Sequence, residues 1–129
     1  MRSVVSTPKG AHAVGPYSQA IKTSDLVFVS GQIALDPETG EIVAGGIEAH
    51  EAHTERALRN VEAILEAARS NLGLVVRCVV YLTTMEHFAA MNSVYERFFG
   101  KDKPSRSTVA VSGLPRNSLI QIETTALIA

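Results

Sequence analysis

Two charged side chains near the carboxyl end of this sequence have types and positions that could support chemistry. Arg106 lies in the stretch KPSRSTVAV, where a proline-led loop turns into an alternating, β-branched strand. Such a position draws a guanidinium away from bulk water. Its contacts with anions are stronger there than in water. Glu123 lies in the last alternating segment, IQIETTA. From the residues alone, Arg106 is more typical of a surface cation or of a salt bridge with Glu123 than of a binding site.

A histidine-rich segment, EAHEAHTE, is the other candidate for chemistry. Its histidines, His50 and His53, are three residues apart and therefore do not match the HExxH spacing of a zinc site. A solvated helix start is the preferred interpretation over a metal site. The single cysteine, Cys78, is interpreted as a small core residue of a buried strand, while His12 and His87 match no catalytic pattern.

The composition limits the class of protein. With 129 residues, 46% of them apolar and 19% charged, the chain has the size of one compact domain, and we expect a single domain over residues 1–129. The 12 basic and 13 acidic groups show no runs of either sign, so no nucleic-acid partner is expected. One cysteine, the absence of an apolar leader and the absence of a long apolar run predict a soluble, cytoplasmic protein without a membrane partner.

The spacing of apolar residues predicts the elements that must position these side chains. Steps of three and four residues indicate helices, and alternating or continuous β-branched runs indicate strands. The order of the segments favours an α+β fold with a mixed β-sheet and two helices on one face. The expected segments are a two-stranded hairpin within 18–35, helices over about 47–68 and 85–99, and strands over 74–84, 107–112 and 119–128.

Side-chain alternation in the last two strands predicts which face of the sheet each candidate occupies. Residues of a strand point alternately to the two faces, so the aliphatic positions should face the helices. Arg106 and Glu123 are then expected together on the opposite face, along with Val75, Val79 and Tyr81. That face carries too much apolar surface to be left in water, and no third helix is available to cover it. We therefore expect a homo-oligomer.

Five segments of the chain stand out together: GPYSQAI at 15–21, SGQI at 30–33, MNSVYERFF at 91–99, PSRSTV at 104–109 and IQIETTA at 120–126. In order and spacing they resemble the signature segments of the RidA (YjgF) family. Each segment is weak alone, but five in order are specific, and the resemblance runs from about Ser6 to Ile128.

The resemblance implies both a fold and a reaction. The fold is chorismate-mutase-like, and the assembly is a homotrimer with its sites in the clefts between subunits. The reaction is the hydrolysis of reactive enamines and imines, 2-aminoacrylate-derived or of the 2-iminobutanoate type, to 2-oxo acids and ammonia. The implied ligands are therefore small imino, enamino or 2-oxo acids, and neither a cofactor nor a metal is implied.

The resemblance also implies a role for each candidate residue. Arg106 matches the arginine that grips the substrate carboxylate, a task that suits the two parallel donors of a guanidinium. Glu123 matches the acidic residue that orients or deprotonates the attacking water, and Tyr17 offers a phenol to hold that water or pass a proton. The other implied substrate contacts are the backbone groups of Gly31 and Thr108, and Asn92 from a neighbouring subunit.

Without the resemblance, three of these residues have plainer interpretations. Tyr17 would be a turn tyrosine with its hydroxyl in water, and Asn92 a polar residue on an exposed helix face. Gly31 would mark a strand bulge. The positions of these side chains in the fold distinguish the two sets of interpretations.

The sequence departs from the family pattern at three places, and two other functions stay open. Thr108 stands where many members have a cysteine, the stretch GGIEAHEAHTERAL at 45–58 is a few residues longer than usual, and Arg69 and Ser70 stand where a glycine commonly ends the first helix. Some family members are described as ribonucleases that inhibit translation, a function that would require a basic groove. Others are described as metabolite-binding or chaperone-like proteins without a reaction, a role that would use Arg106 but not Glu123.

Overall fold

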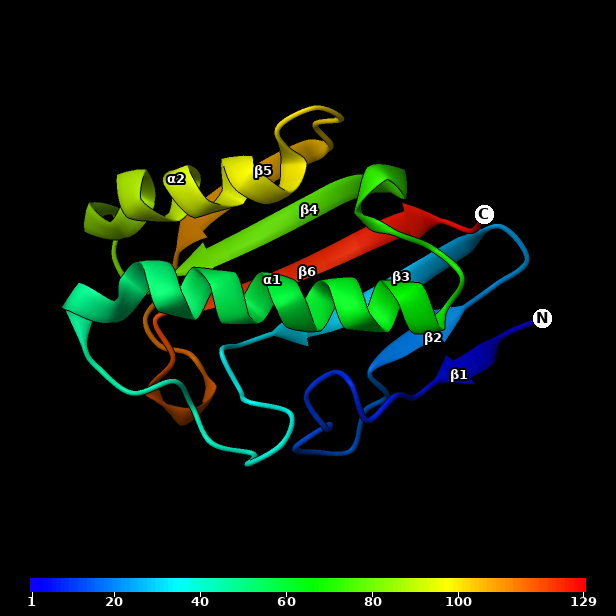
Figure 1. Ribbon diagram of the computed structural model, residues 1–129, viewed down its shortest axis with the longest axis horizontal. Helices are drawn as coiled ribbons and strands as arrows, with labels where there is room; N and C mark the ends of the chain where they lie inside the picture. The colour runs from blue at the N-terminus through cyan, green and yellow to red at the C-terminus, as the bar shows by residue number, and fades with distance from the viewer.

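In a computed structural model, the chain forms one six-stranded sheet with two α-helices on one face (Figure 1). The structure describes the backbone of residues 1–129 and every side chain except that of Ile47. This arrangement confirms the predicted α+β fold with a mixed sheet. The helices are α1 (His50–Ala67) and α2 (Phe88–Phe99), and the strands are β1 (Ser3–Val5), β2 (Ala20–Lys22), β3 (Leu26–Gln32), β4 (Val75–Leu82), β5 (Ser105–Ala110) and β6 (Ile120–Leu127).

The strand order in the sheet is β1-β2-β3-β6-β4-β5. Every neighbouring pair is antiparallel except β4 and β5, which are parallel. Helix α2 makes the crossover that a parallel pair requires, and β2 and β3 form the predicted hairpin. The first strand was not predicted, because three residues are too few to show an alternation.

The core lies between the sheet and the two helices. Every second residue of β6, from Ile120 to Ala126, is buried, as the alternation predicts. Helix α1 buries a stripe that includes Leu58, Ile64 and Leu65, none of which is exposed. Each such side chain contributes about 1.5–3 kcal/mol by burial, which is what fixes α1 on the sheet. Within the part of the chain that the structure describes, no helix combines the length and apolarity needed to cross a membrane.

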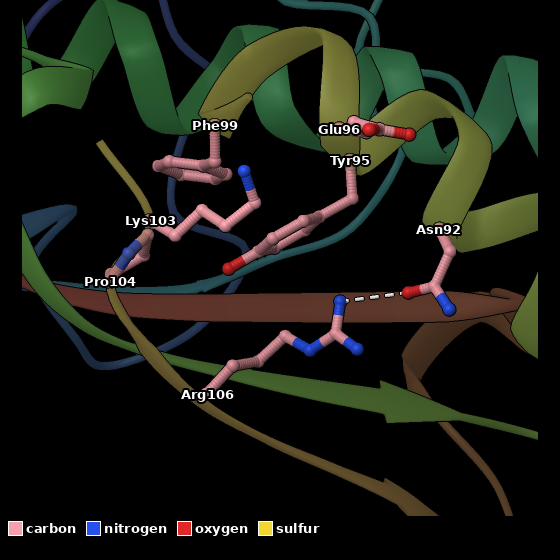
Figure 2. Close-up of a pocket in the computed structure, with 7 residues that line it drawn as sticks. All are labelled: Asn92, Tyr95, Glu96, Phe99, Lys103, Pro104 and Arg106. Carbon is pink, nitrogen blue, oxygen red and sulfur yellow. Dashed lines mark hydrogen bonds between the residues drawn. The ribbon is translucent and has the colours of Figure 1, made fainter. Parts of the chain in front are cut away.

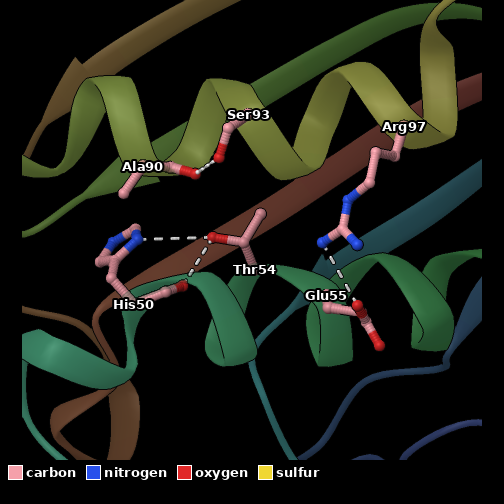
Figure 3. A network of polar contacts seen from close by, with 6 residues as sticks. All are labelled: His50, Thr54, Glu55, Ala90, Ser93 and Arg97. Carbon is pink, nitrogen blue, oxygen red and sulfur yellow. Dashed lines mark hydrogen bonds and ion pairs between the residues drawn. The ribbon is translucent and has the colours of Figure 1, made fainter.

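Polar contacts also join the two helices (Figure 3). Arg97 of α2 donates to Glu55 of α1 at 3.4 Å, and both side chains are largely exposed, so the pair contributes little to stability. At the start of α1, the hydroxyl of Thr54 donates to the backbone oxygen of His50 at 2.9 Å. The Arg97–Glu55 pair lies between α1 and α2, whereas the Thr54 bond lies within the first turn of α1.

The histidines at the start of α1 are buried, so the predicted solvated helix start is wrong for them. His50 and His53 are each 2% exposed, and the ring of His50 stacks on that of His87 at 4.2 Å. Burial, with the nearby rings of His87 and His53, lowers the pKa of His50 to about 4. Burial also lowers the pKa of His53. Among the described residues, no group of three or more His, Cys, Asp or Glu is placed to hold a metal ion.

We call the face of the sheet away from the helices the open face. Val79 and Tyr81 lie on it, as predicted, because they pair with Glu123 and Gln121 of β6. Val75 does not, because a bulge follows it and places it in the core. Several apolar side chains of this face are in water, which fits the expectation that another surface covers it. Their exposed fractions are 63% for Val4, 46% for Phe28, 44% for Val109 and 43% for Leu127.

The predicted face of Arg106 is wrong. In the parallel register of β4 and β5, Arg106 lies beside the core residue Cys78, so its side chain is on the helix face. Glu123 lies beside Val79 and is on the open face. The prediction placed the valines of β5 against the helices, but β5 is an edge strand and Val109 is on the open face beside Tyr81. Within one chain, the two charged candidates therefore occupy opposite faces.

Candidate functional site

Arg106 extends from β5 toward α2, where Asn92 and Tyr95 (Figure 2) and Phe88 hold it. Its Nη1 donates to Oδ1 of Asn92 at 2.8 Å. Its guanidinium carbon lies 4.7 Å from the ring centre of Tyr95 and 5.6 Å from that of Phe88. An acceptor at one end and two aromatic rings fix the position of the guanidinium.

The sequence explains why α2 provides these contacts. Phe88, Asn92 and Tyr95 are four and then three residues apart, so they share one face of the helix. Pro104 precedes β5, whose register with β4 turns Arg106 toward that face. Asn92 therefore contacts the arginine of its own chain, so Asn92 and Arg106 belong to the same part of any site.

A pocket of about 320 Å³ lies beside Arg106. The ammonium of Lys103 donates to the backbone oxygen of Gly100 at 2.5 Å, which places a second positive charge at its wall. Aromatic walls with two nearby cations suit a small anion that also has an apolar part. The lining residues are Asn92, Tyr95, Glu96, Phe99, Lys103, Pro104 and Arg106 (Figure 2).

Arg106 takes part in no ion pair among the described residues. The ion pairs in this part of the chain are Arg59 with Glu62 and Arg97 with Glu55. The plainer interpretation of Arg106 as the partner of Glu123 is therefore wrong. Thr108 lies on the same face as Arg106, beside Val80, and its buried hydroxyl oxygen has no hydrogen-bond partner within the described structure.

On the open face, Glu123 has one polar partner that the sequence did not reveal. The hydroxyl of Tyr81 donates to Oε1 of Glu123. This hydrogen bond to the carboxylate, together with burial, raises the pKa of the Tyr81 phenol. The two residues are diagonal neighbours, because Tyr81 pairs with Gln121 and Glu123 pairs with Val79.

Gly31 and Tyr17 lie on the β3 side of Glu123. Gly31 is in a register shift between Val29 and Gln32, which confirms the strand bulge. A Cβ at Gly31 would come within 2.5 Å of the Gln121 side chain, so a larger residue here would require that side chain to move. The side chain of Tyr17 is 47% exposed, and its hydroxyl accepts from the backbone N–H of Val14 at 3.2 Å.

The segment that follows Tyr17 is attached to β3. The hydroxyl of Ser30 donates to the backbone oxygen of Ser18 at 2.7 Å, and the backbone N–H of Ser30 donates to the backbone oxygen of Gln19 at 2.9 Å. Ser30 directly precedes Gly31, so these bonds connect the Tyr17 segment to the bulge. The turn interpretation of Tyr17 fits its local geometry and is compatible with the implied role.

The structure therefore divides the predicted site residues into two groups. The first, which we call the arginine half-site, lies between β5 and α2. The second, the carboxylate half-site, lies around β3 and β6. The arginine half-site comprises Arg106, Asn92 and Thr108, and the carboxylate half-site comprises Glu123, Gly31 and Tyr17.

Sequence reasoning missed four side chains that shape these half-sites. For Phe88 and Tyr95, their spacing with Asn92 was a usable signal. Lys103 lies in the loop before β5 and has no such spacing. Tyr81 gave no signal as a partner of Glu123, because their contact depends on the register of two strands, 75–82 and 120–127, that are far apart in the sequence.

Comparisons with known proteins extend over almost the whole chain. The family model for endoribonuclease L-PSP matches residues 7–128. A RutC family protein of Pyrococcus abyssi is 48% identical over 125 residues, which cover 97% of this chain and 96% of the relative. The 2-iminobutanoate/2-iminopropanoate deaminase of Mus musculus is 39% identical over 127 residues, which cover 98% of this chain and 92% of the relative.

Solved structures give the same result. The crystal structure of Escherichia coli TdcF with bound serine superposes with a TM-score of 0.91 and is 35% identical, with coverage of 98% of this chain and 99% of that chain. The family model matches residues 7–128, and the TdcF structure covers 98% of the chain. The family match therefore spans every predicted site residue, from Tyr17 to Glu123. The chain belongs to the endoribonuclease L-PSP family, which is the RidA (YjgF) family that its five segments resemble.

Proposed function

We propose that this protein is a deaminase that hydrolyses reactive imines and enamines to 2-oxo acids and ammonia. Its substrates would be of the 2-iminobutanoate type or derived from 2-aminoacrylate, released in the cytoplasm by pyridoxal-phosphate enzymes. The observation that carries the proposal is Arg106, which is fixed by Asn92 and Tyr95 beside a pocket and is paired with no carboxylate of the described chain. The names of the mouse relative and of the serine-bound TdcF structure support this choice of chemistry.

The arginine half-site would hold the substrate carboxylate. Since Nη1 of Arg106 donates to Asn92, the Nη2 and Nε edge of the guanidinium is left for two parallel hydrogen bonds to a carboxylate. Tyr95 holds the plane of the guanidinium in place, so little side-chain entropy is lost on binding. A small 2-imino acid would thus be oriented by its carboxylate, with its imine carbon directed away from β5.

The complete site would lie between two subunits. Arg106 and Glu123 are on opposite faces of the sheet in one chain, so one substrate contacts both only where two chains meet. The exposed apolar side chains of the open face, such as Phe28 and Leu127, support such a contact. We propose a homotrimer with three sites, each made of one arginine half-site and one carboxylate half-site. A monomer in sedimentation at micromolar concentration would contradict this assembly.

In the proposed reaction, an enamine first tautomerises to the imine, whose protonated form is a strong electrophile. Water forms a bond to the imine carbon, one of its protons passes to Glu123, and the C=N electron pair moves to nitrogen. The proton then passes from Glu123 to the nitrogen of the carbinolamine. The C–N bond breaks with its electron pair on nitrogen, the hydroxyl becomes the carbonyl, and its proton leaves with ammonia as ammonium. Water is the only other reactant, and no cofactor takes part.

Tyr17 and Gly31 would complete the carboxylate half-site. The phenol of Tyr17 is largely exposed and would hold the attacking water or pass a proton. The backbone at the Gly31 bulge would contact the substrate, as would the backbone of Thr108 from the other subunit. Positioning of water and substrate supplies most of the rate, because the electrophile is already activated.

The ribonuclease alternative has weaker support in this chain. The family model carries an endoribonuclease description, but the chain has a net charge of −1 and no run of basic residues. Its two cations beside the pocket, Arg106 and Lys103, suit one small anion better than a phosphate backbone. A purely metabolite-binding or chaperone-like role would use the arginine half-site and leave Glu123 without a function.

A competition assay tests the proposal. A pyridoxal-phosphate threonine dehydratase supplies 2-iminobutanoate while semicarbazide traps the free imine, and 2-oxobutanoate formation is followed in the presence and absence of this protein. We expect more 2-oxobutanoate and less trapped imine with the wild-type protein, and little change with Glu123→Gln. Equal trapping with and without the protein, or cleavage of single-stranded RNA that needs Glu123, would contradict the proposed deaminase.

A further inference from the structure

The contact between Tyr81 and Glu123 is the one polar feature of the carboxylate half-site to which the family resemblance assigns no role. The Tyr81 hydroxyl donates to Oε1 of Glu123 across two neighbouring strands. Both side chains are partly buried on the open face, so this hydrogen bond is less weakened by water than one at a fully exposed position. The resemblance assigns a role to the phenol of Tyr17. The hydroxyl of Tyr17 instead accepts a hydrogen bond from the backbone N–H of Val14.

The direction of the hydrogen bond determines what Tyr81 can do. A phenol that donates to a carboxylate favours the ionised carboxylate, which is the form needed for a base. The hydrogen bond to Glu123 raises the pKa of Tyr81, and only the positive charge of Arg77 opposes this shift, so the phenol stays protonated at neutral pH. The Tyr81 hydroxyl therefore remains a hydrogen-bond donor, and Oε1 of Glu123 accepts its hydrogen bond. The other carboxylate oxygen, Oε2, is left to orient a water.

We propose that Tyr81 is a positioning residue for imine hydrolysis, which holds Oε1 of Glu123 and so turns the other carboxylate oxygen toward the attacking water. Tyr81 acts through Glu123 and does not itself contact the substrate. The inference rests on the proposed function and adds to it a residue of β4 that shares no sequence segment with the other members of the half-site.

A double-mutant cycle tests the inference, with Tyr81→Phe, Glu123→Gln and the double variant in the imine assay. Tyr81→Phe keeps the ring and removes only the hydroxyl. We expect kcat to fall about tenfold, the effect of losing one hydrogen bond to a charged group, with KM within about twofold of wild type. In the Glu123→Gln background the same change should have almost no further effect.

Thr125→Val is the matched control, because it removes a hydroxyl from the same strand and face, two residues beyond Glu123. It should leave kcat unchanged. A purely structural role for Tyr81 would lower the melting temperature, and would lower kcat alike in the wild-type and Glu123→Gln backgrounds.

The outcomes separate this inference from the proposed function. An active wild type whose kcat is unchanged by Tyr81→Phe would overturn the inference alone. If Tyr81→Phe lowers kcat by the same factor in the wild type and in the Glu123→Gln variant, the inference is also overturned, because Tyr81 would then act independently of Glu123. A wild-type protein that does not accelerate imine hydrolysis would reject the proposed function, and this inference with it.

Discussion

The helix face and the open face of the sheet hold their charged residues in different ways. On the helix face, Arg106 lies among Phe88, Asn92 and Tyr95, so its position is fixed inside one chain. On the open face, Glu123 has Tyr81 as its hydrogen-bond partner, and neighbouring apolar side chains of the face remain in water. The arginine half-site is thus nearly complete in one chain, whereas the carboxylate half-site needs another surface against it.

This difference explains how one small domain could host a site with few residues. A guanidinium that is already oriented binds a carboxylate without losing further freedom. A carboxylate on an uncovered face becomes useful only after a second chain excludes bulk water from it. In the proposed function, the fold supplies one half-site by packing a helix, and assembly of two chains would complete the other.

The largest effect is expected for Glu123→Gln. Removing the base should lower kcat about 100-fold, the low end for general base catalysis, because glutamine accepts no proton from water. Binding of a carboxylate ligand such as 2-oxobutanoate should change little, because the arginine half-site is intact. Steady-state kinetics and calorimetric titration measure the two quantities. Equal losses in turnover and in binding would indicate a structural role for Glu123.

Arg106→Lys should have the next largest effect. Lysine keeps the charge but lacks two fixed parallel donors, so we expect a loss of about 2 kcal/mol in transition-state binding, roughly 30-fold in kcat/KM. Arg59→Lys is the matched control, because Arg59 is an exposed arginine of α1 whose ion pair with Glu62 lysine can replace. Unchanged kcat/KM in an Arg106→Lys variant that keeps its assembly would refute the carboxylate clamp.

The helix face should also show a dependence of stability on pH. The pKa of His50 is about 4 in the folded chain, below its usual value of 6.5, because the buried ring resists protonation. Below pH 6.5 the unfolded chain gains a proton that the folded chain does not take up, so stability falls from about pH 6.5 down to about pH 4. Between pH 7 and pH 5 we expect a loss on the order of 1 to 2 kcal/mol from this group.

His50→Phe tests this assignment, because it keeps a ring to stack on His87 and removes the titrating group. Urea unfolding at pH 7 and pH 5 should show a smaller difference in the free energy of unfolding than in wild type. The control is His12→Gln, a change at an exposed histidine that should preserve the wild-type difference. A pH dependence that is the same in His50→Phe and wild type would show that another group is responsible.

The smallest effect concerns the end of α1. Arg69 has φ of 64°, the left-handed conformation, and the backbone N–H groups of Arg69 and Ser70 donate to the oxygens of Glu66 and Leu65. This is the hydrogen-bond pattern of a Schellman cap, whose left-handed position favours glycine. Arg69→Gly should raise the free energy of unfolding by about 0.5–1 kcal/mol. Glu66→Gly, one turn earlier in the helix, should lower it by about 1 kcal/mol instead. Thermal unfolding that ranks these variants in the opposite order would contradict the assignment.

The sequence predicted the elements with strong periodic signals. Alternation in β6 correctly placed Ile122 in the core and Glu123 on the other face, because β6 lies in the middle of the sheet and its pattern records burial directly. The same reasoning was wrong for β5. An edge strand such as β5 buries few of its side chains, so its hydrophobic pattern does not determine which face each residue occupies. The register of β5 with β4 determines it instead.

The same limit explains the other misses. The site residues Arg106, Glu123 and Tyr17 were found through the resemblance, and their roles remain predictions. Tyr81 could not be found, because its contact with Glu123 depends on strand register and not on spacing along the chain. The buried histidines were missed because a polar pattern at a helix start gives no sign of the second helix that stacks against it.

Subunit complementation tests the central claim, that each site combines Arg106 of one chain with Glu123 of another. Arg106→Ala and Glu123→Gln chains, each inactive alone, are co-expressed with different tags, and mixed trimers are isolated through both tags. If each site spans two chains, one of the three interfaces in any mixed trimer has both residues intact, and about one third of the wild-type turnover per trimer should return. Mixed trimers that stay as inactive as the two parent variants would show that Arg106 and Glu123 must come from the same chain, and would contradict the account.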